Sequence, residues 1–319
     1  MKFLVTGGSG FVGSHLTEKL LSLDHEVVVI DNVSTGSADN LAAVRKHPKL
    51  RFVIDSILNT KTLEKLIQEC DFIYHLAAAV GVKLIVNDPV NTMQTNIRGT
   101  EIVLHFANKW QKPVLITSTS EVYGKNTNDT FSEDDDMVLG STTQSRWSYA
   151  CSKAIDEFLA ISYHRKNKLP TIIVRMFNTV GPRQVDHYGM VLPTFVKQAL
   201  DQRPITVYGT GQQTRTFTYI DDVVSALVAL PNNEKSYGEV FNVGGNEEIS
   251  MIDLAKLVKE KTASTSEIVI IPYDKAYEPG FEDMLKRVPN IGKISRLIGY
   301  RPSYQLSQIV DRVIDHFKS

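Results

Sequence analysis

The sequence predicts an α/β fold in which helices cover both faces of a doubly wound parallel sheet, with a smaller C-terminal α/β lobe. Two observations predict it. Short apolar, β-branched runs alternate with helix-like segments through the first half of the 319 residues. A glycine-rich turn joins the first run to the first helical segment. Such alternation is typical of parallel sheets with crossover helices.

The first half supplies the predicted sheet. A helical segment follows the first strand at Ser14–Leu23, where Leu16, Leu20 and Leu23 recur at helical spacing. The second strand ends at Asp31. The predicted strands are Lys2–Thr6, Glu26–Ile30, Arg51–Ile54, Phe72–His75, Val114–Thr117 and Thr171–Arg175.

Beyond Asn178 the chain changes character, because Pro182, Pro193, Pro204 and several glycines divide it into shorter pieces. We predict one domain over residues 1–178, with sheet elements returning near 205–245, and a second lobe formed mainly by residues 179–319. The helices predicted there are Leu192–Leu200, Asp221–Leu230, Ile252–Lys261 and Leu306–Phe317.

Composition excludes several classes of protein. Lys and Arg total 35 against 36 Asp and Glu, a net charge of -1, so no basic excess is present for nucleic acid or an anionic membrane. Cys70 and Cys151 are the only cysteines, which excludes a disulfide framework and favours a reducing compartment. No run of apolar residues is long enough to span a membrane. Together these observations predict a cytoplasmic protein. The histidines lack metal-ligand spacing, so we also predict that the protein has no metal site.

Gly7, Gly10 and Gly13 form a GxxGxxG turn between the first strand and the first helix. A pyrophosphate must approach such a backbone closely and sit at the helix N-terminus, beside Phe11 and Val12. Asp31 ends the second strand, where a carboxylate accepts hydrogen bonds from the adenine ribose and repels a 2′-phosphate. The pattern predicts a Rossmann-type domain that binds NAD rather than NADP.

Tyr149 and Lys153 are four residues apart in a helix-like stretch, which places them on one helix face. A tyrosine acts as a base near neutral pH only beside positive charge, which Lys153 and an oxidised nicotinamide would supply. Thr119 follows a buried strand and is the best candidate to share a proton with a substrate hydroxyl. Glu121, two residues on, is a candidate general acid or base.

With these residues the chain resembles the extended short-chain dehydrogenase/reductases, the NAD-dependent nucleotide-sugar epimerases, dehydratases and decarboxylases. The resemblance covers essentially the whole chain. Besides the turn and the Tyr149–Lys153 pair, its motifs are His75-Leu76-Ala77-Ala78, Asn96, Arg175-Met176-Phe177-Asn178, Gly181-Pro182-Arg183, Val207-Tyr208-Gly209, Gln213-Thr214-Arg215-Thr216-Phe217 and Phe241-Asn242-Val243-Gly244.

The resemblance implies a role for each matching position. Tyr149, assisted by Thr119, would remove the proton of the sugar C4 hydroxyl, and Lys153 would bind the nicotinamide ribose and lower the tyrosine pKa. Hydride would pass to NAD and leave a 4-keto sugar. A homodimer would form through the helix of Tyr149–Tyr163 and the one near Thr100–Lys109. The remaining cofactor residues would be Asn32, Asp55, Ile57, Ala77, Ala78 and Asn96. By resemblance the substrate would be a UDP-linked sugar. Its diphosphate would bind to Asn178 and Arg215, and its base would contact Leu192, Val207 and Tyr208. Arg287 would contact the diphosphate or the sugar.

Three chemistries start from that 4-keto sugar. A UDP-sugar 4-epimerase requires the fewest further residues, and we place it first. A UDP-glucuronate decarboxylase comes second, since three motifs resemble that group: Thr119-Ser120-Glu121, Arg146-Trp147-Ser148-Tyr149, and Lys286-Arg287 before a proline. A 4,6-dehydratase comes third. Against a carboxylated sugar, Met190 and Val185 stand where decarboxylases and uronate epimerases carry arginine. An oxidoreductase that releases NADH and a non-enzymatic NAD sensor are less favoured.

Overall fold

The central element of the structure, a computed structural model that describes residues 1–80, 88–184, 190–276 and 282–318, is a seven-stranded parallel sheet. Its strand order is β11-β6-β5-β4-β1-β2-β3. The strands are β1 (Lys2–Thr6), β2 (Glu26–Asp31), β3 (Leu50–Ile54), β4 (Phe72–His75), β5 (Val114–Thr119), β6 (Thr171–Met176) and β11 (Glu239–Val243).

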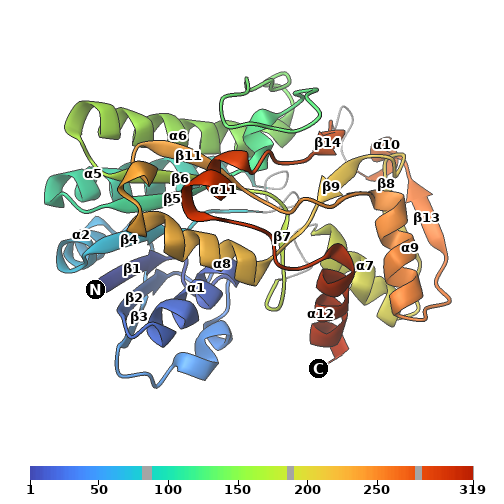
Figure 1. The fold of residues 1–319 in the computed structure, drawn as a ribbon, viewed down its shortest axis with the longest axis horizontal. Coiled ribbons are helices and arrows are strands. Elements are labelled where there is room, and N and C mark those ends of the chain that lie inside the picture. The colour runs from blue at the N-terminus through green and yellow to red at the C-terminus, as the bar shows by residue number, and fades with distance from the viewer. Residues whose placement is uncertain (81–87, 185–189, 277–281, 319) are drawn as a thin grey trace.

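Helices cover both faces of this sheet (Figure 1). On one side α2 (Thr60–Glu69), α5 (Gly99–Trp110) and α6 (Ser148–Asn167) pack on a cluster of fully buried aliphatic side chains that includes Leu4 and Ile116. On the other side lie α1 (Phe11–Ser22) and α8 (Ile220–Ala229), which contact each other. The predicted doubly wound fold is therefore confirmed.

The C-terminal part forms a smaller lobe at one end of the sheet (Figure 1). Its helices are α7 (Val191–Leu200), α9 (Met251–Lys261) and α12 (Leu306–Lys318), each within two residues of its predicted bounds. Short strands pair in small sheets: β8 (Ile205–Tyr208) with β13 (Ile268–Ile271), β7 (Thr179–Val180) with β10 (Thr218–Tyr219), and β9 (Thr214–Thr216) between β12 (Glu248–Ser250) and β14 (Lys286–Arg287). Shorter α-helices among the described residues include α4 (Pro89–Met93), which continues through a π-helical turn (Gln94–Arg98) into α5. They also include α10 (Tyr273–Ala276) and α11 (Gly292–Ile298).

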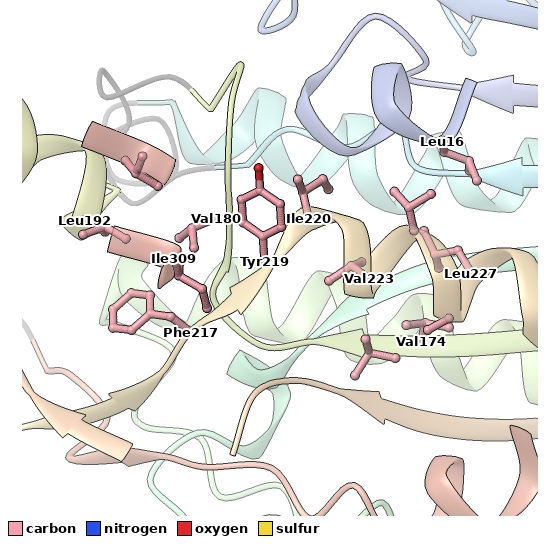
Figure 2. Packing of buried hydrophobic residues seen from close by; sticks show 14 of the residues in the cluster. Leu16, Val174, Val180, Leu192, Phe217, Tyr219, Ile220, Val223, Leu227 and Ile309 are labelled. Atoms are coloured by element: carbon pink, nitrogen blue, oxygen red, sulfur yellow. The ribbon is translucent and has the colours of Figure 1, made fainter. Parts of the chain in front are cut away.

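One hydrophobic cluster joins the sheet to the lobe (Figure 2). It runs from Leu16 on α1 and Val174 on β6, through Ile220, to Leu192 and Ile309 in the lobe. Of the segment 205–245, only residues 239–243 enter the large sheet, while β8 and β9 belong to the small sheets. The lobe and the sheet therefore share their core.

Candidate active site

The glycine turn packs too tightly against its neighbours to admit side chains. Gly7 has φ +71°, and a Cβ on it would lie 2.8 Å from the backbone nitrogen of Ala77 at the end of β4. A Cβ on Gly13 would lie 2.7 Å from the Cα of Gly8. Gly10 is the N-cap of α1 and has no side chain to cover the first N–H groups of the helix. Free N–H groups at a helix N-terminus fit the pyrophosphate of a dinucleotide.

Asp31 joins the glycine turn to the turn after β2. Its carboxylate accepts hydrogen bonds from the backbone N–H of Ser9 at 2.9 Å and from that of Val33 at 2.8 Å. The carboxylate is fixed at the end of β2, where an adenine ribose is expected to bind. Asn32 beside it is exposed, and its side chain accepts from the N–H of Ser34.

The other predicted cofactor residues flank the same end of the sheet. Ala77 donates its N–H to the hydroxyl of Thr6, and Ala78 follows it. Asn96 is buried in the π-helical turn, where its amide pairs with both backbone groups of Ala79 at 2.8 and 3.3 Å. Asp55 and Ile57 follow β3; Asp55 accepts from the N–H of Ser56, and Ile57 lies against Gly99.

Tyr149 and Lys153 lie on α6, and both are buried. The Nζ of Lys153 donates to the Oδ2 of Asp156 at 2.8 Å, and neither of these side chains is more than 4% exposed. Burial raises the pKa of Tyr149, the carboxylates of Glu121 and Asp156 raise it further, and the guanidinium of Arg287 opposes them. The tyrosine therefore needs added positive charge to act as a base near neutral pH.

Thr119 is the last residue of β5, and its hydroxyl accepts from the N–H of Glu121 at 3.3 Å. This contact caps the short 3₁₀ helix Ser120–Tyr123. Glu121 is buried in an ion pair with Arg146, and Arg287 lies 3.5 Å from its other oxygen. Burial raises the pKa of Glu121, but the two guanidinium groups outweigh burial, so its pKa is below the usual range.

Arg287, on β14, donates to the hydroxyl of Ser120 from Nε at 3.1 Å and from Nη2 at 2.6 Å. Burial lowers its pKa to about 10, so the side chain is charged at neutral pH. Arg287 therefore joins the C-terminal lobe to the loop after β5.

Asp283 joins two more arginines to the site. Its carboxylate lies 3.0 Å from Nη2 of Arg215 and 3.7 Å from Nη2 of Arg146, and it accepts from the hydroxyl of Tyr273 at 3.1 Å. Sequence reasoning missed Asp283, and it included Arg146 only as part of a motif. The signal for Arg146 was its place three residues before Tyr149; no signal pointed to Asp283.

The residues predicted for the nucleotide are more dispersed. Asn178 donates to the carbonyl of Thr216 at 2.8 Å, next to Arg215. Leu192 and Val207 are fully buried in the hydrophobic cluster, whereas Tyr208 is 36% exposed. Their contact with a nucleotide base stays a prediction.

The part of the chain that the structure describes contains no group of three His, Cys, Asp or Glu side chains that could hold a metal ion. Among its helices, none has both the length and the apolar character that crossing a bilayer requires. Val185, one of the two motif positions that lack arginine, lies outside the described residues. Met190 is the N-cap of α7.

Comparison with known proteins places these features in a family. Residues 4–313 match the model of the GDP-mannose 4,6 dehydratase family. The chain is 39% identical over 320 residues to a UDP-N-acetyl-alpha-D-glucosaminuronate decarboxylase from Bacillus cytotoxicus, with 99% of this chain and 97% of that one covered. It is 36% identical to UDP-glucuronic acid decarboxylase 1 from Arabidopsis thaliana, with 100% and 70% covered.

Among solved structures, the chain is similar to the UDP-glucuronic acid 4-epimerase from Bacillus cereus in complex with UDP-glucuronic acid and NAD. The TM-score is 0.90 at 32% identity, covering 100% of this chain and 99% of that one. The match to the family model extends over nearly the whole chain and includes the glycine turn, the Tyr149–Lys153 pair and β14. The chain therefore belongs to the GDP-mannose 4,6 dehydratase family, within the NAD-dependent extended short-chain dehydrogenase/reductases.

Proposed function

We propose that this chain is an NAD-dependent decarboxylase of a UDP-linked uronate, the second of the three chemistries weighed from the sequence. The observation that carries the proposal is the set of charges around Glu121. Arg146 and Arg287 lie beside Glu121, and Arg146 and Arg215 lie beside Asp283. Guanidinium groups gathered in this way are suited to binding an anionic substrate.

This arrangement answers the objection to a carboxylated sugar. The argument against a carboxylated sugar was that Met190 and Val185 stand at two motif positions where related enzymes carry arginine. The structure has Arg287 on β14, hydrogen-bonded to Ser120, and Arg146 beside Glu121. Both curated relatives named above are decarboxylases, which favours this chemistry over the 4-epimerase placed first.

NAD, when bound, takes a hydride from the sugar C4 and later returns it. The glycine turn and Asp31 would hold the dinucleotide, since the turn has free N–H groups and Asp31 is fixed where the ribose is expected. Residues 1–178 would form most of this site, and residues 179–319 most of the substrate lobe.

The chain's own residues would move protons around that exchange. Tyr149, with Lys153 and Thr119, would accept the proton of the C4 hydroxyl. A carboxylate on C5 is then β to a ketone, so its C–C bond can break as CO2 leaves and the electron pair moves into the enolate. Arg287 and Ser120 would bind the substrate anion, and Glu121 would act in proton transfer at C5.

The test is to incubate the purified protein separately with UDP-glucuronate, UDP-N-acetylglucosaminuronate and UDP-glucose, following products by NMR and mass spectrometry. We expect loss of one CO2 from a uronate and no change in UDP-glucose. A product of unchanged mass with inverted C4 would instead establish the epimerase. Glu121→Gln should lower decarboxylation by about 10²–10⁴-fold, the usual contribution of a general acid or base.

We also propose a homodimer through α5 and α6, as the family resemblance implies. Phe158 on α6 is consistent with such a face, because its side chain is 61% exposed in the single chain. An exposed aromatic side chain on a long helix is typical of an interface.

A further inference from the structure

Asp156 contacts Lys153 of the reacting pair and has no part in the chemistry described so far. It follows Lys153 by three residues on α6, so both side chains lie on the same helix face. Its side chain is fully buried, and its Oδ2 accepts from Nζ of Lys153 at 2.8 Å. A fully buried carboxylate is costly to ionise, so its presence beside a catalytic lysine requires an explanation.

The surroundings of Asp156 hold it in the core of the site. Burial raises its pKa, while the ammonium of Lys153 and the hydroxyl of Thr100 on α5 lower it and the neighbouring Glu157 raises it. Thr100 also contacts Nε2 of His75 at 3.1 Å, and Nδ1 of His75 contacts the hydroxyl of Thr6 at 2.8 Å. Burial, with the charge of Lys153, lowers the pKa of His75 to about 3, so this imidazole is neutral.

We propose that Asp156 is a positioning residue that acts through Lys153: it fixes the lysine ammonium on the helix face that carries Tyr149 and sets the pH at which Tyr149 releases its proton. The ion pair holds Lys153 to one position on α6, since the ammonium is nearly excluded from water. The carboxylate also cancels part of the positive charge that Tyr149 experiences. The inference rests on the proposed function in taking Tyr149 as the base at C4.

The other charges that act on Tyr149 come from three different elements. Glu121 lies on the loop after β5, Arg146 precedes α6 and Arg287 comes from β14. Glu121 opposes loss of the tyrosine proton, whereas the two arginines favour it. Removing the charge of Asp156 while leaving these groups in place should therefore make Tyr149 more acidic.

The experiment compares Asp156→Asn, which removes the charge and keeps an oxygen acceptor for Lys153, with Asp156→Glu, which keeps the charge and moves it by one methylene. The control is Asp253→Asn, which removes the same charge from a surface pair with Lys256 three residues away on α9. Each protein is studied with NAD bound. The ionisation of Tyr149 is followed by ultraviolet difference titration against the same protein carrying Tyr149→Phe.

We expect the titration of Tyr149 to move to lower pH by about one unit or more in Asp156→Asn. It should stay near the wild-type position in Asp253→Asn, and it should not move to lower pH in Asp156→Glu, because that variant keeps the charge. The acid limb of the kcat–pH profile should move with it, and kcat should fall in Asp156→Glu because the ammonium is displaced.

An unchanged titration in Asp156→Asn would overturn the inference, because a merely structural aspartate alters stability without moving the ionisation of Tyr149. If Asp156→Asn does not fold, a shift of one unit to lower pH in Asp156→Glu overturns the inference, since that variant keeps the charge. The titration also separates this inference from the proposed reaction. A shifted titration without CO2 release refutes only the decarboxylase, and CO2 release with an unmoved titration refutes only the role of Asp156.

Discussion

Replacing Arg146 by methionine tests the electrostatics of the site most directly. Arg146 and Glu121 form a buried pair whose side chains are 3% and 11% exposed. Arg146 is also the largest favourable influence on the ionisation of Glu121, ahead of Arg287. Methionine fills similar space without the charge, so Glu121 would remain buried with Arg287 as its nearest cation.

The magnitude follows from the cost of breaking such a pair. Removing one partner of a buried ion pair costs about 3–5 kcal/mol, and the remaining contact of Glu121 with Arg287 argues for the lower end. Without Arg146, burial outweighs the remaining guanidinium charge, so the pKa of Glu121 should rise above its usual range.

The contribution of Glu121 to the free energy of unfolding then depends on pH with the opposite sign. In the wild type the pKa of Glu121 is lowered, so its contribution to stability is present above the unfolded pKa and is lost as pH falls through the folded pKa. In Arg146→Met the pKa is raised, so the contribution is present at low pH and is lost as pH rises through the folded value. The deficit in the free energy of unfolding relative to wild type should be about 3 kcal/mol near pH 8 and smaller near pH 5, where the buried carboxyl takes up a proton more readily.

Urea unfolding of both proteins near pH 5 and pH 8 measures this difference. In the double variant Arg146→Met/Glu121→Gln, the loss of unfolding free energy relative to wild type should no longer depend on pH between about 5 and 8, because the carboxyl group of Glu121 is absent. Lys261→Met, which breaks a partly exposed pair with Asp311, serves as the control and should cost about 1 kcal/mol or less in pairing. A deficit for Arg146→Met that is equal at both pH values would refute this account of Glu121.

Three further substitutions test the rest of the site. Gly13→Ala should weaken NAD binding, measured by calorimetry, at least about tenfold. The new Cβ would lie 2.7 Å from the Cα of Gly8 and displace the turn. An unchanged affinity for NAD would count against a phosphate site at this turn. Tyr149→Phe should abolish turnover while the purified protein retains NAD, and substantial residual activity would remove Tyr149 as the base. Phe158→Glu should convert a dimer into monomers in sedimentation experiments, and a wild type that is already monomeric would end the dimer proposal.

Local patterns predicted much of the fold and part of the site. The strands of the first half have the predicted positions within two residues, because each, apart from the partly exposed edge strand β3, is a buried apolar run. Gly7, Gly13 and Asp31 lie together as their spacing indicates, since a strand–turn–helix unit fixes its own geometry.

The charged contacts could not be predicted in the same way. Glu121 and Arg146 are 25 residues apart in the sequence, and Ser120 and Arg287 are 167 apart. Only the contact between β14 and the segment after β5 brings the second pair together, and no periodicity in the sequence indicates that contact. The lack of arginine at Met190 and Val185 therefore gave too little weight to the decarboxylase alternative, which the curated relatives favour over the epimerase.

The place of β11 in the sheet has a consequence for synthesis of the chain. β11 pairs with β6 as the last strand of the sheet, although more than sixty residues of lobe separate the two in the sequence. On the ribosome, β1 to β6 emerge first, and the backbone groups of β6 have no partner on that side until Glu239–Val243 follow. An apolar strand edge left open in this way invites pairing with other nascent chains. This protein should therefore depend on chaperones during translation more than a protein whose sheet is completed in chain order.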